Sequence, residues 1–292
     1  MELKGAITAL VTPFQGDKLD EERFREHIEW QIKQGVDGLL PCGTTGESAT
    51  LSHQEHKDVI RICIDQTKGR VPVLAGAGSN STREAVELTA YAKEAGADAA
   101  LLITPYYNKP TQAGLFAHYR AIAREVSLPQ VVYNVPGRTG INLLPETLAR
   151  MQRDIPEVIG VKEASGNINQ ISRIIEACGR DFNVLAGEDF ITLPLLSQGG
   201  KGVISVVSNV APKLMADLCR AFHSREVDRA IDIHYQLTPL YRGMFLETNP
   251  IPVKTALAHM GRMELELRLP LVPLNEENDT ELRRIMQECG LS

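Results

Sequence analysis

The feature that most constrains the fold is a regular alternation of short apolar runs with longer amphipathic stretches. The apolar runs lie at residues 5–12, 38–41, 71–75, 99–104, 130–134, 158–162, 183–186 and 202–206. Short, almost wholly apolar runs are typical of parallel strands that are covered on both faces. The stretches between them place apolar residues at helical spacing, as at Ala85, Leu88, Ala92 and Ala95.

Eight strand–helix units predict an α/β fold of the (β/α)8 TIM-barrel type. A doubly wound sheet is the main alternative, but the G-x-G-x-x-G turn that would favour it does not follow the first strand. The strand pattern ends near residue 224, and residues 226–241, 250–260 and 279–288 have helical patterns. We therefore expect a catalytic barrel over residues 1–224 and a small C-terminal helical extension over residues 225–292.

The net charge, the N-terminal apolar run and the cysteines bear on whether the protein binds nucleic acid, crosses a membrane or resides in the cytoplasm. The net charge is −6 and no Lys/Arg-rich run occurs, which argues against a nucleic-acid partner. The apolar N-terminal run is too short to cross a membrane. Five dispersed cysteines without a C-x-x-C pair are typical of reduced thiols, so the sequence predicts a cytoplasmic protein.

Reactive side chains follow several of the predicted strands, where a barrel gathers its catalytic groups. Lys162 ends an apolar strand, so its side chain should lie inside the barrel. A lysine that merely extends its amine to solvent is the alternative. A desolvated amine would instead have a lowered pKa and attack the ketone of a 2-oxo acid, giving an iminium that activates the adjacent methyl group.

Tyr133 ends the preceding strand and could transfer protons at the same carbon, with the hydroxyls of Thr44 and Tyr107 nearby. A core tyrosine is the alternative. The Gly-Thr-Thr-Gly turn at residues 43–46 offers N–H groups and hydroxyls that suit a carboxylate. Arg138, in a Pro-Gly loop, could bind a second carboxylate with its two-pronged guanidinium or lie on the surface.

A metal or other cofactor is not expected. His53 and His56 could form half of a metal site, but no third ligand at suitable spacing is evident. We therefore expect neither a metal nor a cofactor.

With these residues in view, the whole chain resembles the dihydrodipicolinate synthases of the N-acetylneuraminate lyase superfamily. The segments that carry the resemblance are GTTGESATL at 43–51, TPYYNKPTQAGL at 104–115, YNVPGRTG at 133–140, GVKEASGN at 160–167, GGKGVISV at 199–206 and NPIPVK at 249–254. The strand-end lysine and the glycine turn belong to the wider superfamily. The arginine of YNVPGRT points to the synthases rather than to sugar-acid lyases.

The resemblance implies a role for each matching residue. Lys162 would form a Schiff base with pyruvate, and Tyr133 would move protons through Thr44 and through Tyr107 of a neighbouring subunit. Thr45 would hold the pyruvate carboxylate, beside Gly187 and Ile204. Arg138 would bind the carboxylate of L-aspartate 4-semialdehyde. The family is usually a homotetramer, a dimer of tight dimers.

The resemblance also implies feedback inhibition by L-lysine. In lysine-sensitive relatives the effector binds at the subunit interface, and the matching residues here are Ser48, Ala49, His53, His56, Asn80, Glu84 and Tyr106. A polar helix start that faces solvent is the alternative for these positions.

Three other functions remain open from the sequence. A sibling pyruvate aldolase, acting on N-acetylneuraminate or 2-keto-3-deoxygluconate, would share Lys162 and Tyr133 but has little use for Arg138. A metal-dependent class II aldolase would need a ligand cluster that the sequence does not show. A catalytically silent barrel would have no use for the Lys/Tyr/Thr/Arg set.

Overall fold

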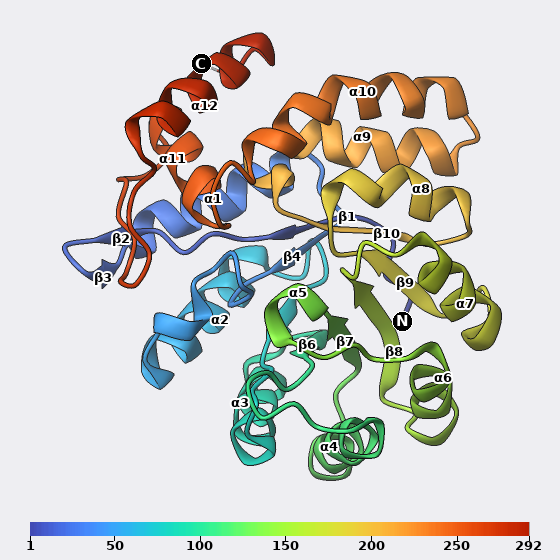
Figure 1. The fold of residues 1–292 in the computed structure, drawn as a ribbon. Helices are drawn as coiled ribbons and strands as arrows, with labels where there is room; N and C mark the ends of the chain where they lie inside the picture. The colour runs from blue at the N-terminus through green and yellow to red at the C-terminus, as the bar shows by residue number, and fades with distance from the viewer. Residues whose placement is uncertain (292) are drawn as a thin grey trace.

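A computed structural model describes residues 1–291 and shows eight parallel strands that curl into a barrel (Figure 1). Their order in the sheet is β4-β1-β10-β9-β8-β7-β6-β5, and a parallel bridge between Leu39 and Val73 joins the two edges. The strands are β1 Gly5–Ala9, β4 Gly38–Leu40, β5 Leu74–Gly76, β6 Ala99–Ile103, β7 Gln130–Asn134, β8 Val158–Glu163, β9 Asn183–Ala186 and β10 Gly202–Ser205. The predicted TIM barrel is confirmed, with each strand inside the run that predicted it or within one residue of it.

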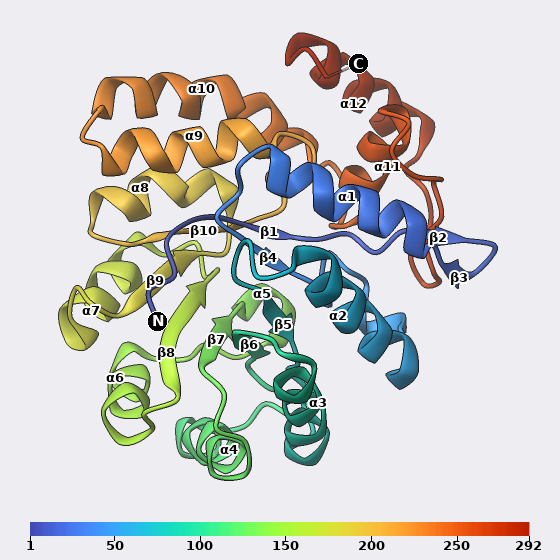
Figure 2. The ribbon, with the colours of Figure 1, turned by 180° about the vertical axis from the view of Figure 1, so that it is seen from behind.

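Helices surround the barrel in both views (Figures 1 and 2). The α-helices are α1 Glu21–Lys33, α2 His53–Thr67, α3 Thr82–Ala95, α4 Gln112–Glu125, α5 Pro136–Thr139, α6 Pro145–Asp154, α7 Ile168–Cys178, α8 Thr192–Ser197, α9 Pro212–His223, α10 Val227–Gly243, α11 Ile251–His259 and α12 Glu276–Glu288. The short 3-10 helices are η1 Ser48–Thr50, η2 Asp189–Ile191 and η3 Val207–Asn209. A small antiparallel hairpin, β2 Phe14–Gln15 with β3 Lys18–Leu19, was not predicted.

Two apolar layers form the core. Inside the barrel, side chains from alternate strand positions such as Ile7, Leu101, Leu185 and Ile204 pack together. The larger outer layer packs the other strand face against the helices. The inner layer fills the barrel, so that reactive groups at the strand ends sit on a packed floor.

The helices of the C-terminal extension pack on one another and on the barrel. Helix α10 packs along α9, α12 packs against both α10 and α11, and α11 lies beside the α1 side of the barrel (Figures 1 and 2). The loop before α11 reaches the barrel mouth, where Asn249 contacts Thr45. The division at residue 224 stays a prediction, and the extension takes part in the mouth of the barrel.

Within residues 1–291, none of the helices has both the length and the apolar character needed to cross a membrane.

Candidate active site

Lys162 lies near the carboxyl end of β8 with its side chain in the barrel interior. Only 6% of the residue is exposed. Lys162 pairs directly with Tyr133 of the neighbouring strand β7, and its amine lies 4.3 Å from the centre of the Tyr133 ring. The prediction that this lysine points into the barrel beside Tyr133 therefore agrees with the geometry.

Burial lowers the pKa of Lys162 from 10.5 to about 7. The nearby carboxylate of Asp189 opposes this shift, while the guanidinium of Arg138 adds to it. Desolvation outweighs the attraction of Asp189 because the amine would have to keep its charge in an apolar interior. At neutral pH a large fraction of Lys162 is the free amine, which is the nucleophilic form.

Tyr133 is also buried, and burial raises the pKa of its phenol to about 12. Arg138 and an interaction with the Thr44 hydroxyl act against this shift. The phenol therefore stays protonated at neutral pH and can donate a proton beside Lys162. Thr44 lies close enough to Tyr133 to influence this pKa, as the predicted proton relay requires.

Gly187, which directly follows β9, packs closely beside Lys162. A Cβ on Gly187 would lie 2.6 Å from the Cβ of Ala164 and 3.2 Å from the Cγ of Lys162, so only glycine leaves the lysine stem its room. Ile204 is fully buried in the inner apolar layer. Gly187 is therefore part of the wall around Lys162, and Ile204 is part of the packed barrel interior.

The turn after β4 presents unused donors. Within residues 1–291, no acceptor takes a hydrogen bond from the backbone N–H of Thr44 or Thr45. The Thr45 side chain is buried, and its Oγ1 accepts a hydrogen bond of 3.0 Å from Nδ2 of Asn249. Two N–H groups without an acceptor beside a fixed hydroxyl have the chemistry that the predicted carboxylate site requires.

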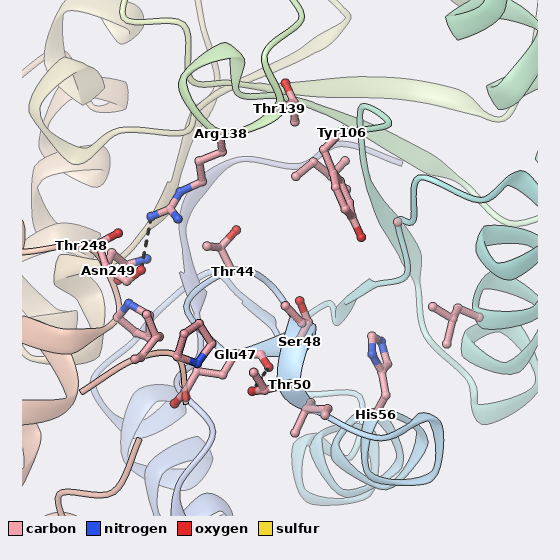
Figure 3. Close-up of a pocket in the computed structure, with 18 of the residues that line it drawn as sticks. Thr44, Glu47, Ser48, Thr50, His56, Tyr106, Arg138, Thr139, Thr248 and Asn249 are labelled. Atoms are coloured by element: carbon pink, nitrogen blue, oxygen red, sulfur yellow. Dashed lines mark hydrogen bonds between the residues drawn. The ribbon is translucent and has the colours of Figure 1, made fainter. Parts of the chain in front are cut away.

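Arg138, on the short helix α5, extends across the mouth toward the C-terminal loop (Figure 3). Its Nη2 donates a hydrogen bond of 3.2 Å to the carbonyl of Asn249. Asn249 thus contacts both the Thr45 turn and Arg138, and its own Oδ1 is buried with no hydrogen-bond partner in the described chain. Asn249 therefore lies between the two groups, Thr45 and Arg138, that the sequence predicts to bind carboxylates.

A cavity of about 520 Å³ opens beside this mouth and is lined by Thr44, Arg138 and Asn249 (Figure 3). Six of the seven residues predicted to bind L-lysine line the same cavity: Ser48, Ala49, His53, His56, Glu84 and Tyr106. The seventh, Asn80, does not line it, although its carbonyl accepts a hydrogen bond from Asn108 in the loop after Tyr106.

Charged and polar groups of this cavity are held in place by hydrogen bonds. His53 lies 3.2 Å from Glu84, and Glu84 also accepts a hydrogen bond from Ser79. Nε2 of His56 lies 2.7 Å from the carbonyl of Gly76, and burial lowers the pKa of the His56 ring. Burial, followed by the nearby Glu84, raises the pKa of Tyr106, whose ring points into the cavity in Figure 3.

Tyr107 is the one predicted catalytic residue that lies outside the mouth. It is 88% exposed and its backbone is left-handed, with φ 67°. Its side chain therefore does not join Tyr133 and Thr44 within the single chain.

Sequence reasoning missed three features of the site. Asp189 acts electrostatically on Lys162. It directly follows Glu188 at the end of a predicted strand, and this position alone would have marked it as a candidate site residue. Asn249 lies in the NPIPVK segment, but nothing local in the sequence shows that this loop returns to the barrel. The buried ion pair between Glu47 and Lys254 joins residues 207 positions apart.

Residues 1–291 contain no group of three or more His, Cys, Asp or Glu side chains that could hold a metal ion. The pair His53 and His56 therefore gains no third ligand from elsewhere in that range.

Comparison with known proteins adds independent findings. The profile of the Dihydrodipicolinate synthetase family matches residues 2–289. The 4-hydroxy-tetrahydrodipicolinate synthase of Nitratidesulfovibrio vulgaris (strain DP4) is 67% identical over 291 residues, which cover 100% of both chains.

Two solved structures are close in shape. The chloride-inhibited dihydrodipicolinate synthase from Acinetobacter baumannii, complexed with pyruvate, has a TM-score of 0.97 at 43% identity, with 99% of each chain covered. DHDPS from Cyanidioschyzon merolae with lysine bound has a TM-score of 0.96 at 40% identity, again with 99% of each chain covered. The profile match and the full-length identity show that the chain belongs to the dihydrodipicolinate synthetase family.

Proposed function

We propose that the chain catalyses the condensation of pyruvate with L-aspartate 4-semialdehyde to 4-hydroxy-tetrahydrodipicolinate, in lysine and diaminopimelate biosynthesis. The observation that carries this proposal is the buried Lys162 amine, with a pKa lowered to about 7, paired across the sheet with Tyr133. The relatives named for this reaction match the chain over its full length.

The first stage uses Lys162 and Tyr133. The free amine attacks the keto carbon of pyruvate, and loss of water gives an iminium. The Tyr133 hydroxyl supplies the proton that leaves with that water, and Thr44 returns a proton to Tyr133. The free N–H groups of Thr44 and Thr45 bind the pyruvate carboxylate.

The second stage forms the carbon–carbon bond and closes the ring. The iminium withdraws electrons, so the pyruvate methyl loses a proton and becomes the nucleophilic carbon of an enamine. This carbon attacks the aldehyde, whose oxygen takes up the proton that the methyl group lost and becomes the 4-hydroxyl, while Arg138 binds the second substrate's carboxylate. The substrate amine then adds to the iminium carbon and displaces Lys162, which regenerates the free enzyme.

Arg138 favours this reaction over that of a sibling sugar-acid aldolase. Its guanidinium lies at the mouth and hydrogen-bonds only through Nη2 among the described residues, so donors remain for a substrate carboxylate. A bidentate carboxylate partner suits an amino-acid aldehyde.

A homotetramer, built as a dimer of tight dimers, fits two separate exposed apolar surfaces. The first lies beside the cavity and includes Tyr107 and Leu269, exposed by 88% and 78%. The second runs along α10 at Val227, Ile231 and Tyr235, four residues apart on one helix face. In the tight dimer Tyr107 would reach the neighbouring subunit's Thr44 and extend its proton relay. The five free cysteines fit a protein of the reducing cytoplasm.

A coupled assay tests the proposed function. With pyruvate and L-aspartate 4-semialdehyde the purified protein should form the cyclic product without added metal. N-acetylneuraminate and 2-keto-3-deoxygluconate, assayed in parallel, should be cleaved far more slowly. Faster cleavage of either sugar acid would refute the assignment.

A further inference from the structure

A buried ion pair outside the Schiff-base chemistry joins the barrel mouth to the C-terminal extension. Nζ of Lys254 lies 2.6 Å from Oε1 of Glu47, and the two side chains are 0% and 1% exposed. Burial lowers the pKa of Lys254, although Glu47 opposes the shift. Because two buried charges lose their hydration, such a pair is a poor source of stability and needs another explanation.

Glu47 is the last residue of the turn that presents the free N–H groups of Thr44 and Thr45. Its backbone is left-handed, with φ 52°, which is an uncommon conformation for a residue other than glycine. The second carboxylate oxygen of Glu47 accepts a hydrogen bond of 3.1 Å from the backbone N–H of Arg268. Both oxygens of Glu47 are therefore bound by the C-terminal extension.

Lys254 and Arg268, which bind the two carboxylate oxygens of Glu47, are themselves in contact with neighbouring side chains. The ring of Phe14 lies 4.4 Å from the Lys254 amine and 4.2 Å from the Arg268 guanidinium. Arg268 also bonds Glu55 at 2.5 Å and the carbonyl of Thr50 at 3.2 Å. The segment from Glu47 to Glu55 is thus attached to the extension at several points.

The same extension reaches the substrate groups. Helix α11, which carries Lys254, begins two residues after Asn249, and Asn249 contacts both Thr45 and Arg138. A shift of the turn away from Lys254 would move the N–H groups of Thr44 and Thr45. A displacement of about 1 Å in the groups that position a substrate can cost about a hundredfold in a site's effectiveness.

We propose that Glu47 and Lys254 are positioning residues that hold the carboxylate-binding turn of residues 43–47 in its binding conformation. This inference rests on the proposed function, because the carboxylate in question is that of a 2-oxo acid such as pyruvate. The pair touches no reacting atom and acts through the backbone of Thr44 and Thr45. The C-terminal extension is therefore part of the machinery that binds the first substrate.

Three variants distinguish a role of the ion pair in positioning the turn of residues 43–47 from a role in stabilising the fold. Lys254→Met leaves the Glu47 carboxylate buried without its partner, Glu47→Gln leaves the amine without its partner, and the double variant removes both charges. Glu29→Gln is the matched control, since it breaks the partly exposed ion pair with Arg70, which precedes β5 at the end of the barrel opposite the mouth. For each protein, kcat and KM for both substrates, Tm, and amide hydrogen exchange of residues 43–50 without substrate are measured.

Each single variant should raise the KM for pyruvate by about tenfold or more, with kcat at saturating pyruvate within about threefold of the parent. The double variant should regain the parental Tm yet keep the raised KM and show faster exchange over residues 43–50. The Glu29 control should match the parent.

A double variant that regains the parental KM together with its Tm would overturn the proposal, as would unchanged exchange over residues 43–50 in the variants. The parent's own turnover tests the proposed function separately, and the exchange measurement does not depend on it.

Discussion

At the scale of single residues, the reactivity of Lys162 follows from its burial. An ordinary lysine with a pKa of 10.5 is neutral in about one molecule per thousand at pH 7.5, whereas an amine with a pKa of about 7 is mostly neutral there. No base is then needed to free the nucleophile.

This predicts the pH dependence of adduct formation. Lowering the pKa of a base moves its neutral form to lower pH, so the rate of pyruvate adduct formation should rise about tenfold per pH unit below 7 and level off above about 8. Stopped-flow or quenched trapping in matched buffers measures the rate. A small alkylamine, as control, should keep gaining rate up to about pH 10. An enzyme profile that also rises to pH 10 would show that Lys162 is not desolvated in solution.

Arg138 carries a second prediction at this scale. Arg138→Ala should reduce kcat/KM for L-aspartate 4-semialdehyde roughly tenfold to a hundredfold, because a charged hydrogen bond to the carboxylate is lost. Formation of the pyruvate adduct should stay within about threefold of the parent. Arg180→Ala, at an exposed position between α7 and β9, serves as control. An unchanged kcat/KM for the aldehyde would make Arg138 a surface residue only.

The places of some site residues could be predicted from the sequence, whereas those of others could not. Lys162 and Tyr133 were predictable because each ends an apolar run, and strand ends of a barrel converge. Asn249 and Lys254 were not, because their roles depend on where a loop far along the chain returns. The buried state of Glu47 was likewise hidden, since a glutamate at a turn is ordinarily exposed.

At the scale of elements, the spacing of β8 and β9 determines the room around Lys162. The alternation of strands and helices was predictable because parallel strands buried on both faces need continuous apolar runs. The two-residue strands of the β2–β3 hairpin were not, because so short a pairing leaves no periodic signal.

The packing of these two strands predicts the effect of Gly187→Ala. The added methyl group would overlap the Cβ of Ala164 and crowd the stem of Lys162, and relief of such overpacking costs about 1–3 kcal/mol. We expect adduct formation to slow by about tenfold or more. Gly137→Ala is the control, because a Cβ there meets nothing within 4 Å. Equal adduct rates in Gly187→Ala and the parent would contradict this prediction, because they would show that the neighbouring residues can shift to accommodate the added methyl group.

At the scale of the whole molecule, one cavity joins the proposed effector residues to the catalytic mouth. Thr44 and Arg138 line the same space as Glu84 and Tyr106. A bound amino acid would therefore lie close to the proton relay without filling the pocket of Lys162.

This arrangement predicts partial inhibition by millimolar L-lysine. Glu84 would pair with an ammonium group of the effector, so Glu84→Thr should relieve the inhibition while leaving turnover without L-lysine within about threefold. Glu87→Thr, on the exposed face of the same helix, should stay as sensitive as the parent. Full turnover of the parent at millimolar L-lysine would contradict the effector site.

The measurement that tests the account most directly is borohydride trapping with pyruvate, followed by mass spectrometry of the digested protein. The account predicts a single reduced pyruvyl group on Lys162, with activity lost in proportion to labelling, and no label on Lys254, which is more deeply buried and is ion-paired with Glu47. Lys162→Arg should take up no label, because a guanidinium stays protonated. An adduct on any other lysine, or no adduct at all, would contradict the account.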